Sequence, residues 1–175
     1  MSQARKILVT GASGYVGGRL VTALLADGAD VRVFVRDANK AQSHSWANQV
    51  EIATGNASDF QSTKDALTGV HTAYYLLHSI NLGPNFDEIE REMACNFAKA
   101  AELAGVSQII YLGGIANDVN ISKHLASRAM TGSSLATTSV AVLELRAGII
   151  IGSGSASFEM LRHLTHRLPI MTTPK

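Results

Sequence analysis

The sequence predicts an α/β protein built on a doubly wound parallel sheet of about six strands, in the order 3-2-1-4-5-6, with helices on both faces. Three observations support this prediction. A glycine-rich turn joins an apolar strand to a helix near the start of the chain. Predicted strands and helices then alternate along the whole sequence. Several of the strands are short apolar runs, which is typical of parallel strands buried on both faces.

The first strand, turn and helix occupy residues 6–20, K-I-L-V-T-G-A-S-G-Y-V-G-G-R-L. Glycines recur there at positions 11, 14 and 17, in the spacing G-x-x-G-x-x-G. The first glycine permits the tight turn, the second lets a pyrophosphate approach the backbone, and the third lets helix and strand pack closely. An anion over the helix N-terminus meets unpaired N–H groups. The alternative is a turn without a ligand, but a second strand at the expected distance favours the dinucleotide-binding unit of a Rossmann fold.

The remaining elements follow from apolar periodicity, capping residues and turn signals. Strands are expected at residues 31–35, 50–53, 72–77, 108–112 and 140–145. Helices are expected at about 59–67, 86–104 and 122–135, with a short polar helix or loop at 38–48. A last amphipathic helix ends at Pro169 and has one apolar face, formed by Phe158, Leu161, Leu164 and Leu168. No linker is indicated, so residues 1–175 are expected to form one domain.

Composition narrows the range of functions. The chain has 175 residues, of which 46% are hydrophobic and 17% are charged, as in a globular domain. Its formal net charge of +1 gives no reason to expect binding to nucleic acid or to an anionic membrane. The single cysteine, Cys95, excludes an internal disulfide, and no His, Cys and carboxylate cluster has metal-ligand spacing. With no signal peptide and no apolar run near the ~18 residues that span a bilayer, a soluble cytoplasmic protein is expected.

Five motifs give the sequence its resemblance to a known family. They are V-T-G-A-S-G-Y-V-G, V-F-V-R-D, A-Y-Y-L-L-H-S, I-I-Y-L-G-G and L-R-A-G-I-I-I-G-S-G-S-A-S-F-E-M-L. In this order they resemble the atypical and extended short-chain dehydrogenase/reductases, in particular the NmrA-like, NAD(P)H-binding group of the epimerase/dehydratase type. The resemblance covers essentially the whole chain. Because family members usually continue with another strand and a substrate-capping region, it implies that this chain is the cofactor half of a longer protein or a short member.

The resemblance implies a nicotinamide dinucleotide cofactor. The implied cofactor-binding residues of the glycine turn and first helical turn are Gly11, Ser13, Gly14, Tyr15, Val16 and Gly17. Those implied for the adenosine and for the nicotinamide-side ribose are Arg36, Asn56, Ala57, Leu76, Leu77 and His78. Asn56 departs from the family, which usually has an aspartate there, although an amide can still hydrogen-bond to adenine.

The choice between NADP and NAD depends on the residues that follow the second strand. An arginine there accommodates the 2′-phosphate of NADP, whereas a carboxylate accepts hydrogen bonds from the ribose of NAD. Arg36 therefore favours NADP, and the adjacent Asp37 leaves NAD possible.

The catalytic residues of the family are not reproduced. Its members commonly use a serine after the fifth strand and a Tyr-x-x-x-Lys pair on the next helix, and here these positions hold Gly113-Gly114 and the pair His124 and Arg128. Arg128 stays charged and cannot relay a proton, but it can hold a ribose or a carbonyl. His124 can donate a proton near neutral pH. The alternative is an exposed histidine at a polar helix start.

Two functions are compatible with this sequence. The first is an NAD(P)-dependent oxidoreductase or epimerase/dehydratase relative acting on an unidentified small molecule, which the motif at residues 146–154 favours. The second is a non-catalytic NmrA-like redox sensor, which the missing Ser/Tyr/Lys triad favours. In both cases we expect no efficient carbonyl reduction with common substrates.

Assembly is suggested by the longest predicted helix, residues 86–104. Several small apolar residues lie off its main apolar stripe, namely Ala94, Cys95, Ala98 and Ala101. A helix that is apolar on more than one face is buried on more than one face. Because related extended enzymes pair this helix across a two-fold axis, the resemblance implies a homodimer.

Overall fold

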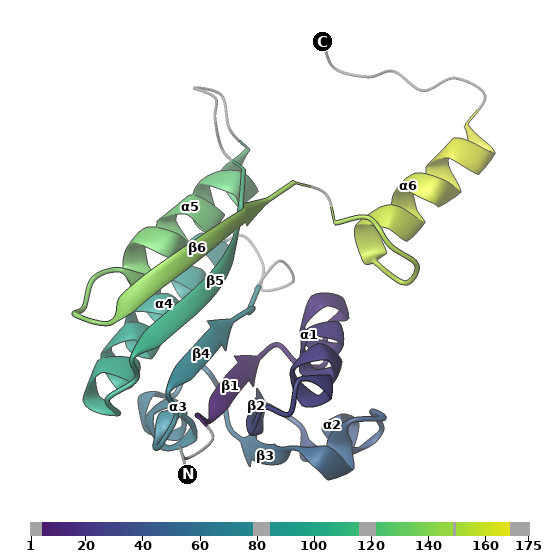
Figure 1. The fold of residues 1–175 in the computed structure, drawn as a ribbon. Helices are drawn as coiled ribbons and strands as arrows, with labels where there is room; N and C mark the ends of the chain where they lie inside the picture. The colour runs from purple at the N-terminus through teal and green to yellow at the C-terminus, as the bar shows by residue number, and fades with distance from the viewer. Residues whose placement is uncertain (1–4, 79–84, 116–121, 149, 169–175) are drawn as a thin grey trace.

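The structure, a computed structural model, describes residues 5–78, 85–115, 122–148 and 150–168. Six parallel strands form one sheet in the order β3-β2-β1-β4-β5-β6, which confirms the predicted topology (Figure 1). The strands are β1 (Ile7–Thr10), β2 (Val31–Val35), β3 (Glu51–Thr54), β4 (Thr72–Tyr75), β5 (Gln108–Gly114) and β6 (Ala141–Ala147). Pro169, expected to end the last helix, and the chain end at Lys175 lie outside the described residues.

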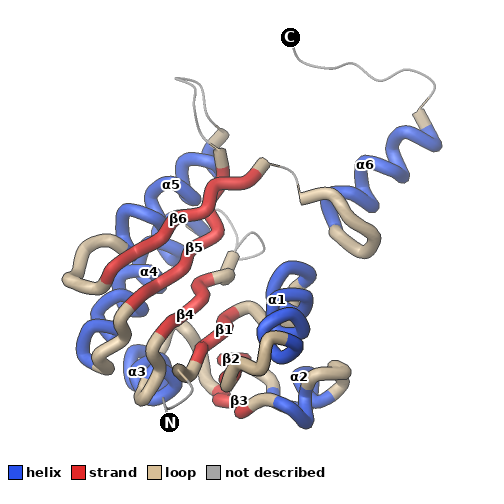
Figure 2. Tube along the Cα trace, in the orientation of Figure 1, coloured by secondary structure: helices blue, strands red, loops and turns tan. Residues whose placement is uncertain are grey.

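The helices form a layer on each face of the sheet. They are α1 (Tyr15–Ala26), α2 (Ala38–Gln42), α3 (Phe60–Leu67), α4 (Phe86–Leu103), α5 (Lys123–Leu135) and α6 (Ala156–Arg167). A 3₁₀ turn, η1 (Ala47–Gln49), follows α2. Helices α1 and α2 lie on one side of the sheet, and α3, α4 and α5 lie on the other (Figures 1 and 2). None of the described helices is both long and apolar enough to span a membrane.

The two faces of the sheet support two separate apolar cores. On β1, Leu8 belongs to the core beneath α3, α4 and α5, whereas Val9 belongs to the core beneath α1 and α2. Successive side chains of a strand point to opposite faces, so one strand contributes to both layers. The larger core includes the rings of Tyr75, Phe97 and Tyr111, which meet edge to face at centroid distances of 5.0 and 6.1 Å.

Helix α4 is buried on more than one face, as its sequence predicts, but its neighbours belong to the same chain. Ala94, Ala98 and Ala101 are fully buried, with α3 on one side of α4 and α5 on the other (Figure 2). The extra apolar positions of this helix therefore do not by themselves require a partner subunit. The homodimer stays a prediction.

Among the described residues, the helices on the α1 side of the sheet leave part of that face exposed to solvent. On the edge strand β6, Leu143 and Leu145 are 45% and 49% exposed. Helix α6 lies apart from the sheet in Figure 1, and the leucines of its predicted apolar face are exposed rather than buried. The loop before α6 contacts α1, where an Arg19 Nη2–H group donates to the Ser153 carbonyl at 3.1 Å.

The strand order reverses between β1 and β4, and Thr10 links the two strands at that point. Thr10 is fully buried, and its hydroxyl donates to the Tyr74 carbonyl at 3.0 Å while accepting from the Leu76 N–H at 2.9 Å. The main-chain pairing of β1 with β4 ends at Val9 and Tyr74. The threonine side chain thus continues the ladder after the strands diverge, which is why β4 ends two residues earlier than predicted.

We expect Thr10→Val to cost about 1–3 kcal/mol of unfolding free energy, because it leaves the Leu76 N–H and the Tyr74 carbonyl without their partner. The control is Thr22→Val, since Thr22 is exposed and its hydroxyl bonds only within its own helix, to Gly18. That variant should stay within about 0.5 kcal/mol of the wild type. Urea unfolding followed by circular dichroism measures both, and equal losses would contradict the role given to Thr10.

Candidate functional site

A cleft of about 560 Å³ opens at the carboxyl ends of the central strands. Its lining comes from the segments that follow β1, β2, β3 and β4, together with one residue of α4. The lining residues are Gly11, Ser13, Gly14, Phe34, Val35, Arg36, Gly55, Asn56, Ala57, Ser58, Leu76, Leu77, His78 and Met93. In open α/β sheets, ligands bind in the crevice beside the point where the strand order reverses. The cleft occupies that position.

The glycine turn forms one wall of the cleft, and the backbone there leaves no room for side chains. Gly11 has φ +66°, and a Cβ atom at this position would lie 2.7 Å from the Leu76 carbonyl oxygen. The Gly14 N–H donates to the Gly11 carbonyl at 2.9 Å. A Cβ atom on Gly17 would overlap that same carbonyl, so this glycine is what allows α1 to pack against the end of β1. These contacts agree with the tight turn assigned to Gly11 and the close packing assigned to Gly17, while the role of Gly14 beside a pyrophosphate stays a prediction.

The N-terminus of α1 begins without a side-chain cap, so its first turn presents backbone groups alone. Gly14 occupies the N-cap position and provides no side-chain hydrogen bond to the first turn. The first N–H groups of a helix have no partner within the helix, and the helix dipole adds positive potential at the same place. Ser13, exposed beside this turn, lines the cleft.

At the end of the cleft next to β2, two adjacent residues differ in their hydrogen-bond partners. Arg36 is exposed and lines the cleft. The Asp37 carboxylate caps α2 by accepting from the backbone N–H groups of Asn39 and Lys40, at 2.9 and 3.2 Å. The arginine is therefore available to a ligand, while the carboxylate is engaged in an N-cap.

Asn56 and Ala57 lie next to this end of the cleft. The side-chain oxygen of Asn56 accepts from the Ser58 N–H at 3.1 Å, which leaves its amide NH₂ group facing outward as a donor. Ala57 is buried. A planar group placed here would meet one hydrogen-bond donor and an apolar surface.

The opposite end of the cleft is formed by the segment after β4, where Leu76, Leu77 and His78 follow one another. His78 is exposed by surface area, yet desolvation by the surrounding protein, followed by the positive charge of Arg128, lowers its pKa to about 4. Its imidazole is therefore neutral at pH 7. A neutral imidazole can donate one hydrogen bond and accept another.

His124 and Arg128 lie on one face of α5, one turn apart. The His124 ring contacts the Phe86 ring at a centroid distance of 6.2 Å. Arg128 is half-buried, and one Nη2–H group donates to the Leu112 carbonyl near the end of β5, at 2.7 Å. Its Nε atom is buried without a hydrogen-bond partner in the described part of the chain. Both residues affect the pKa of His78, so α5 borders the same end of the cleft.

The structure thus gathers nine of the sequence-predicted cofactor residues around one cleft and leaves others out of its lining. Those outside are Tyr15, Val16, Gly17, His124 and Arg128. The Tyr15 side chain turns away, against Gly152, and the Arg19 guanidinium lies 4.6 Å from its ring centroid. Gly17 acts through packing. The roles of these residues stay predictions.

Several lining residues were missed by the sequence analysis, namely Phe34, Val35, Gly55, Ser58 and Met93. Phe34 and Val35 end β2, and the rule that ligands bind at the carboxyl ends of parallel strands gave a signal for them. Gly55 is also required by packing, because a Cβ atom there would lie 2.8 Å from the Phe34 ring. Met93 comes from α4, whose distance in sequence from the strand ends gave no signal.

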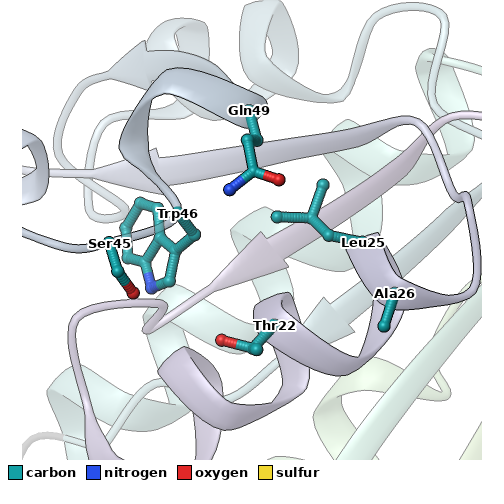
Figure 3. Close-up of a pocket in the computed structure, with 6 residues that line it drawn as sticks. All are labelled: Thr22, Leu25, Ala26, Ser45, Trp46 and Gln49. Atoms are coloured by element: carbon teal, nitrogen blue, oxygen red, sulfur yellow. The ribbon is translucent and has the colours of Figure 1, made fainter.

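A second cavity, of about 280 Å³, lies between the later turns of α1 and the segment after α2 (Figure 3). Its lining residues are Thr22, Leu25, Ala26, Ser45, Trp46 and Gln49. It carries no charged side chain and lies at the end of α1 remote from the glycine turn. The larger cleft is the better candidate for an anionic ligand. Among the described residues, no three His, Cys, Asp or Glu side chains gather as metal ligands.

We expect Gly17→Ala to destabilise the fold by about 1–3 kcal/mol, because the new methyl group would force α1 away from the Gly11 carbonyl. Helix propensity alone would favour alanine by about 1 kcal/mol. A net loss of stability in Gly17→Ala would therefore show that the steric clash outweighs propensity. Gly18→Ala is the matched control, since its Cβ atom would lie 3.3 Å from the Ala12 oxygen and needs little adjustment. Unfolding midpoints measure both variants. A Gly17→Ala protein as stable as the wild type would show that α1 does not need this close approach.

Comparisons with known proteins agree with this architecture. A model of the NmrA-like family matches residues 3–130. The ceramide reductase of Caulobacter vibrioides is 28% identical over 171 residues, which is 94% of this chain and 52% of that protein. The sterol demethylase protein B of Methylococcus capsulatus is 44% identical over 68 residues, which is 39% of this chain and 20% of that protein.

Among solved structures, the triphenylmethane reductase of Citrobacter sp. complexed with NADP(H) superimposes with a TM-score of 0.73 and 27% identity. The match covers 92% of this chain and 55% of the reductase. The chain therefore spans about half the length of the ceramide reductase and of the triphenylmethane reductase.

Proposed function

The chain belongs to the NmrA-like family, and on that premise we propose that it binds NADP(H) in the large cleft and acts as an oxidoreductase on a small molecule. The observation that carries the proposal is the single cleft that runs from Arg36, past the glycine turn, to His78. The solved relative that holds NADP(H) supports the cofactor class.

The residues of the cleft fit a dinucleotide from end to end. The tight glycine turn and the uncapped start of α1 would hold the pyrophosphate with backbone N–H groups. The donor amide of Asn56 and the buried Ala57 would accommodate adenine. The segment at residues 76–78 would line the nicotinamide-side ribose.

The preference for NADP over NAD rests on Arg36. Its guanidinium is exposed toward the cleft, whereas the neighbouring Asp37 is engaged in capping α2. Both capping bonds go to Asp37 Oδ1, so they fix the orientation of the carboxylate and leave its second oxygen free to accept. The 2′-phosphate of NADP would gain a charge-assisted hydrogen bond from Arg36.

We expect Arg36→Ala to weaken NADPH binding about tenfold to a hundredfold, equivalent to ~1.5–3 kcal/mol, and to leave NADH binding nearly unchanged. Isothermal titration calorimetry with both cofactors measures the difference. Lys40→Ala, which removes a nearby positive charge outside the cleft lining, is the control for general electrostatics. Equal affinities of the wild type for NADPH and NADH would refute the preference.

A reduced nicotinamide supplies a hydride when it is bound. At that end of the cleft, we assign His124 the role of proton donor and Arg128 the role of holding the substrate oxygen. Arg128 keeps its charge at every accessible pH and so cannot be the donor. A side chain at Gly113 would lie 2.5 Å from a Glu144 carboxylate oxygen, and one at Gly114 would contact Leu125 and Arg128. The Glu144 carboxylate is the mobile end of a side chain and can move aside for a small side chain at Gly113, whereas Gly114 is closely packed.

When NADPH oxidation is assayed with quinones, ketones or aldehydes, we expect weak activity. His124→Ala should lower that activity by roughly 10²-fold or more, as expected for loss of a general acid. Absorbance of the reduced nicotinamide measures the rate, and His163→Ala on the exposed helix α6 is the control. Turnover that survives His124→Ala would place the proton donor elsewhere.

The second candidate function is a redox sensor that binds the dinucleotide without turnover. The glycines in place of the family's serine favour it, because they leave the site without a hydroxyl donor. NADPH binding that depends on Arg36, combined with no oxidation across the substrate panel, would favour the sensor over the enzyme.

A further inference from the structure

A buried carboxylate links α4 to α5 behind the nicotinamide end of the cleft. Glu90 on α4 is 5% exposed and Ser127 on α5 is 2% exposed. The Ser127 hydroxyl donates to a Glu90 carboxylate oxygen. Neither residue was singled out by the sequence analysis, because their positions lie 37 residues apart and neither belongs to a motif.

Stability alone gives little reason to place a carboxylate here. Taking a charged group out of water carries a large cost, and apolar residues of similar size often pack a helix interface equally well or better. The rest of the buried surface of α4 is apolar, with Ala94, Phe97 and Ala98 fully or almost fully buried. The burial of Glu90 at this interface therefore suggests a role other than stability.

Ser127 lies directly between the two residues of α5 that border the cleft. His124 precedes it by one turn, and Arg128 follows it at the next position. Two hydrogen bonds also tie this segment to β5, from the Tyr111 hydroxyl to the Arg128 carbonyl at 2.9 Å and from the Arg128 guanidinium to the Leu112 carbonyl at 2.7 Å. A hydrogen bond that holds Ser127 therefore also influences which way His124 and Arg128 face, because all three lie on the same turn of α5.

Glu90 is also connected to the cleft through its own helix. Met93, one turn later on α4, lines the cleft. The charged and titratable groups around this point come from five elements. They are Tyr75 on β4, His78 after it, Tyr111 on β5, Glu90 and Cys95 on α4, and His124 and Arg128 on α5, with Glu144 of β6 beside Tyr111 as a fifth element.

We propose that Glu90 is a positioning residue of the reaction site: by accepting the Ser127 hydroxyl it holds α5 in the orientation that directs His124 and Arg128 to the cleft, and its negative charge balances Arg128. This inference rests on the proposed function. It adds a residue that touches neither cofactor nor substrate and acts through α5 and through the local field.

The charge of Glu90 has a measurable consequence at His78. The pKa of His78 is lowered by desolvation first and by Arg128 second, while Glu90 raises it and so opposes Arg128. Glu90→Gln retains an oxygen that can accept the Ser127 hydroxyl but removes the charge. We expect the titration midpoint of the His78 imidazole to fall further in this variant, because Arg128 is then left uncompensated.

Nuclear magnetic resonance of the imidazole groups, followed from neutral pH downward, tests the inference without cofactor or substrate. Glu102→Gln is the matched control, since Glu102 lies on the same helix and accepts from a serine, Ser139, at 2.7 Å, but is exposed and distant from the cleft. Glu90→Asp, which keeps the carboxylate, should restore part of the wild-type midpoint. We also expect Glu90→Gln to lower kcat of NADPH oxidation with little change in the Kd of NADPH.

An unchanged His78 midpoint in Glu90→Gln, or an equal shift in Glu102→Gln, would overturn the proposal. Should Glu90→Gln not fold, Glu90→Asp decides: its carboxylate is withdrawn by one methylene group, so a small downward shift supports the proposal and a wild-type midpoint contradicts it. Failure of the chain to bind or oxidise NADPH would refute the proposed function but would leave the imidazole titration readable.

Discussion

The close approach of α1 to the end of β1 is the contact on which the rest of the site depends. It brings the first helical turn to the mouth of the sheet and places the Gly11 carbonyl against Gly17 with no space for a side chain between them. Gly11 adopts φ +66° at the same point and lies against the Leu76 backbone. A dinucleotide pyrophosphate needs backbone N–H groups within hydrogen-bond reach. Only a chain without side chains at these positions can provide them.

The cleft is a consequence of topology as much as of the glycine turn. The chain runs outward from β1 through β2 to β3 and then returns to place β4 on the other side of β1. The helices that follow β1 and β4 lie on opposite faces of the sheet, so the loops after these two strands separate (Figure 1). Thr10 holds the two strands together at the last point where they remain parallel, with hydrogen bonds on both sides of its hydroxyl. One buried side chain therefore determines where the sheet closes and where the ligand cleft begins.

The sequence predicted the fold and the glycine turn between β1 and α1 well, because both depend on local signals. Strand and helix periodicity, glycine spacing and the alternation of elements are all visible over a few residues. The same logic located Arg36 and His78 at strand ends. It failed for α6, whose apolar periodicity predicts a buried face that the described part of the chain does not provide. Periodicity shows that a helix has an apolar face but does not identify what covers it.

The nicotinamide end could not be predicted in the same way, because it is assembled by tertiary contacts. His124 and Arg128 stand out in the sequence only by comparison with the tyrosine and lysine that they replace. The group that fixes their helix, Glu90, lies 37 residues from its partner Ser127 and resembles any other carboxylate at an acidic helix start, where neighbours such as Asp87 suit the helix dipole. Burial distinguishes them: Asp87 pairs with Lys123 at 3.1 Å near the surface, whereas Glu90 is enclosed. A charge enclosed next to the reaction site influences every titratable group around it, since water no longer screens it. The backbone thus sets the contacts of the glycine turn, whereas a few enclosed side chains set the electrostatic field around His78.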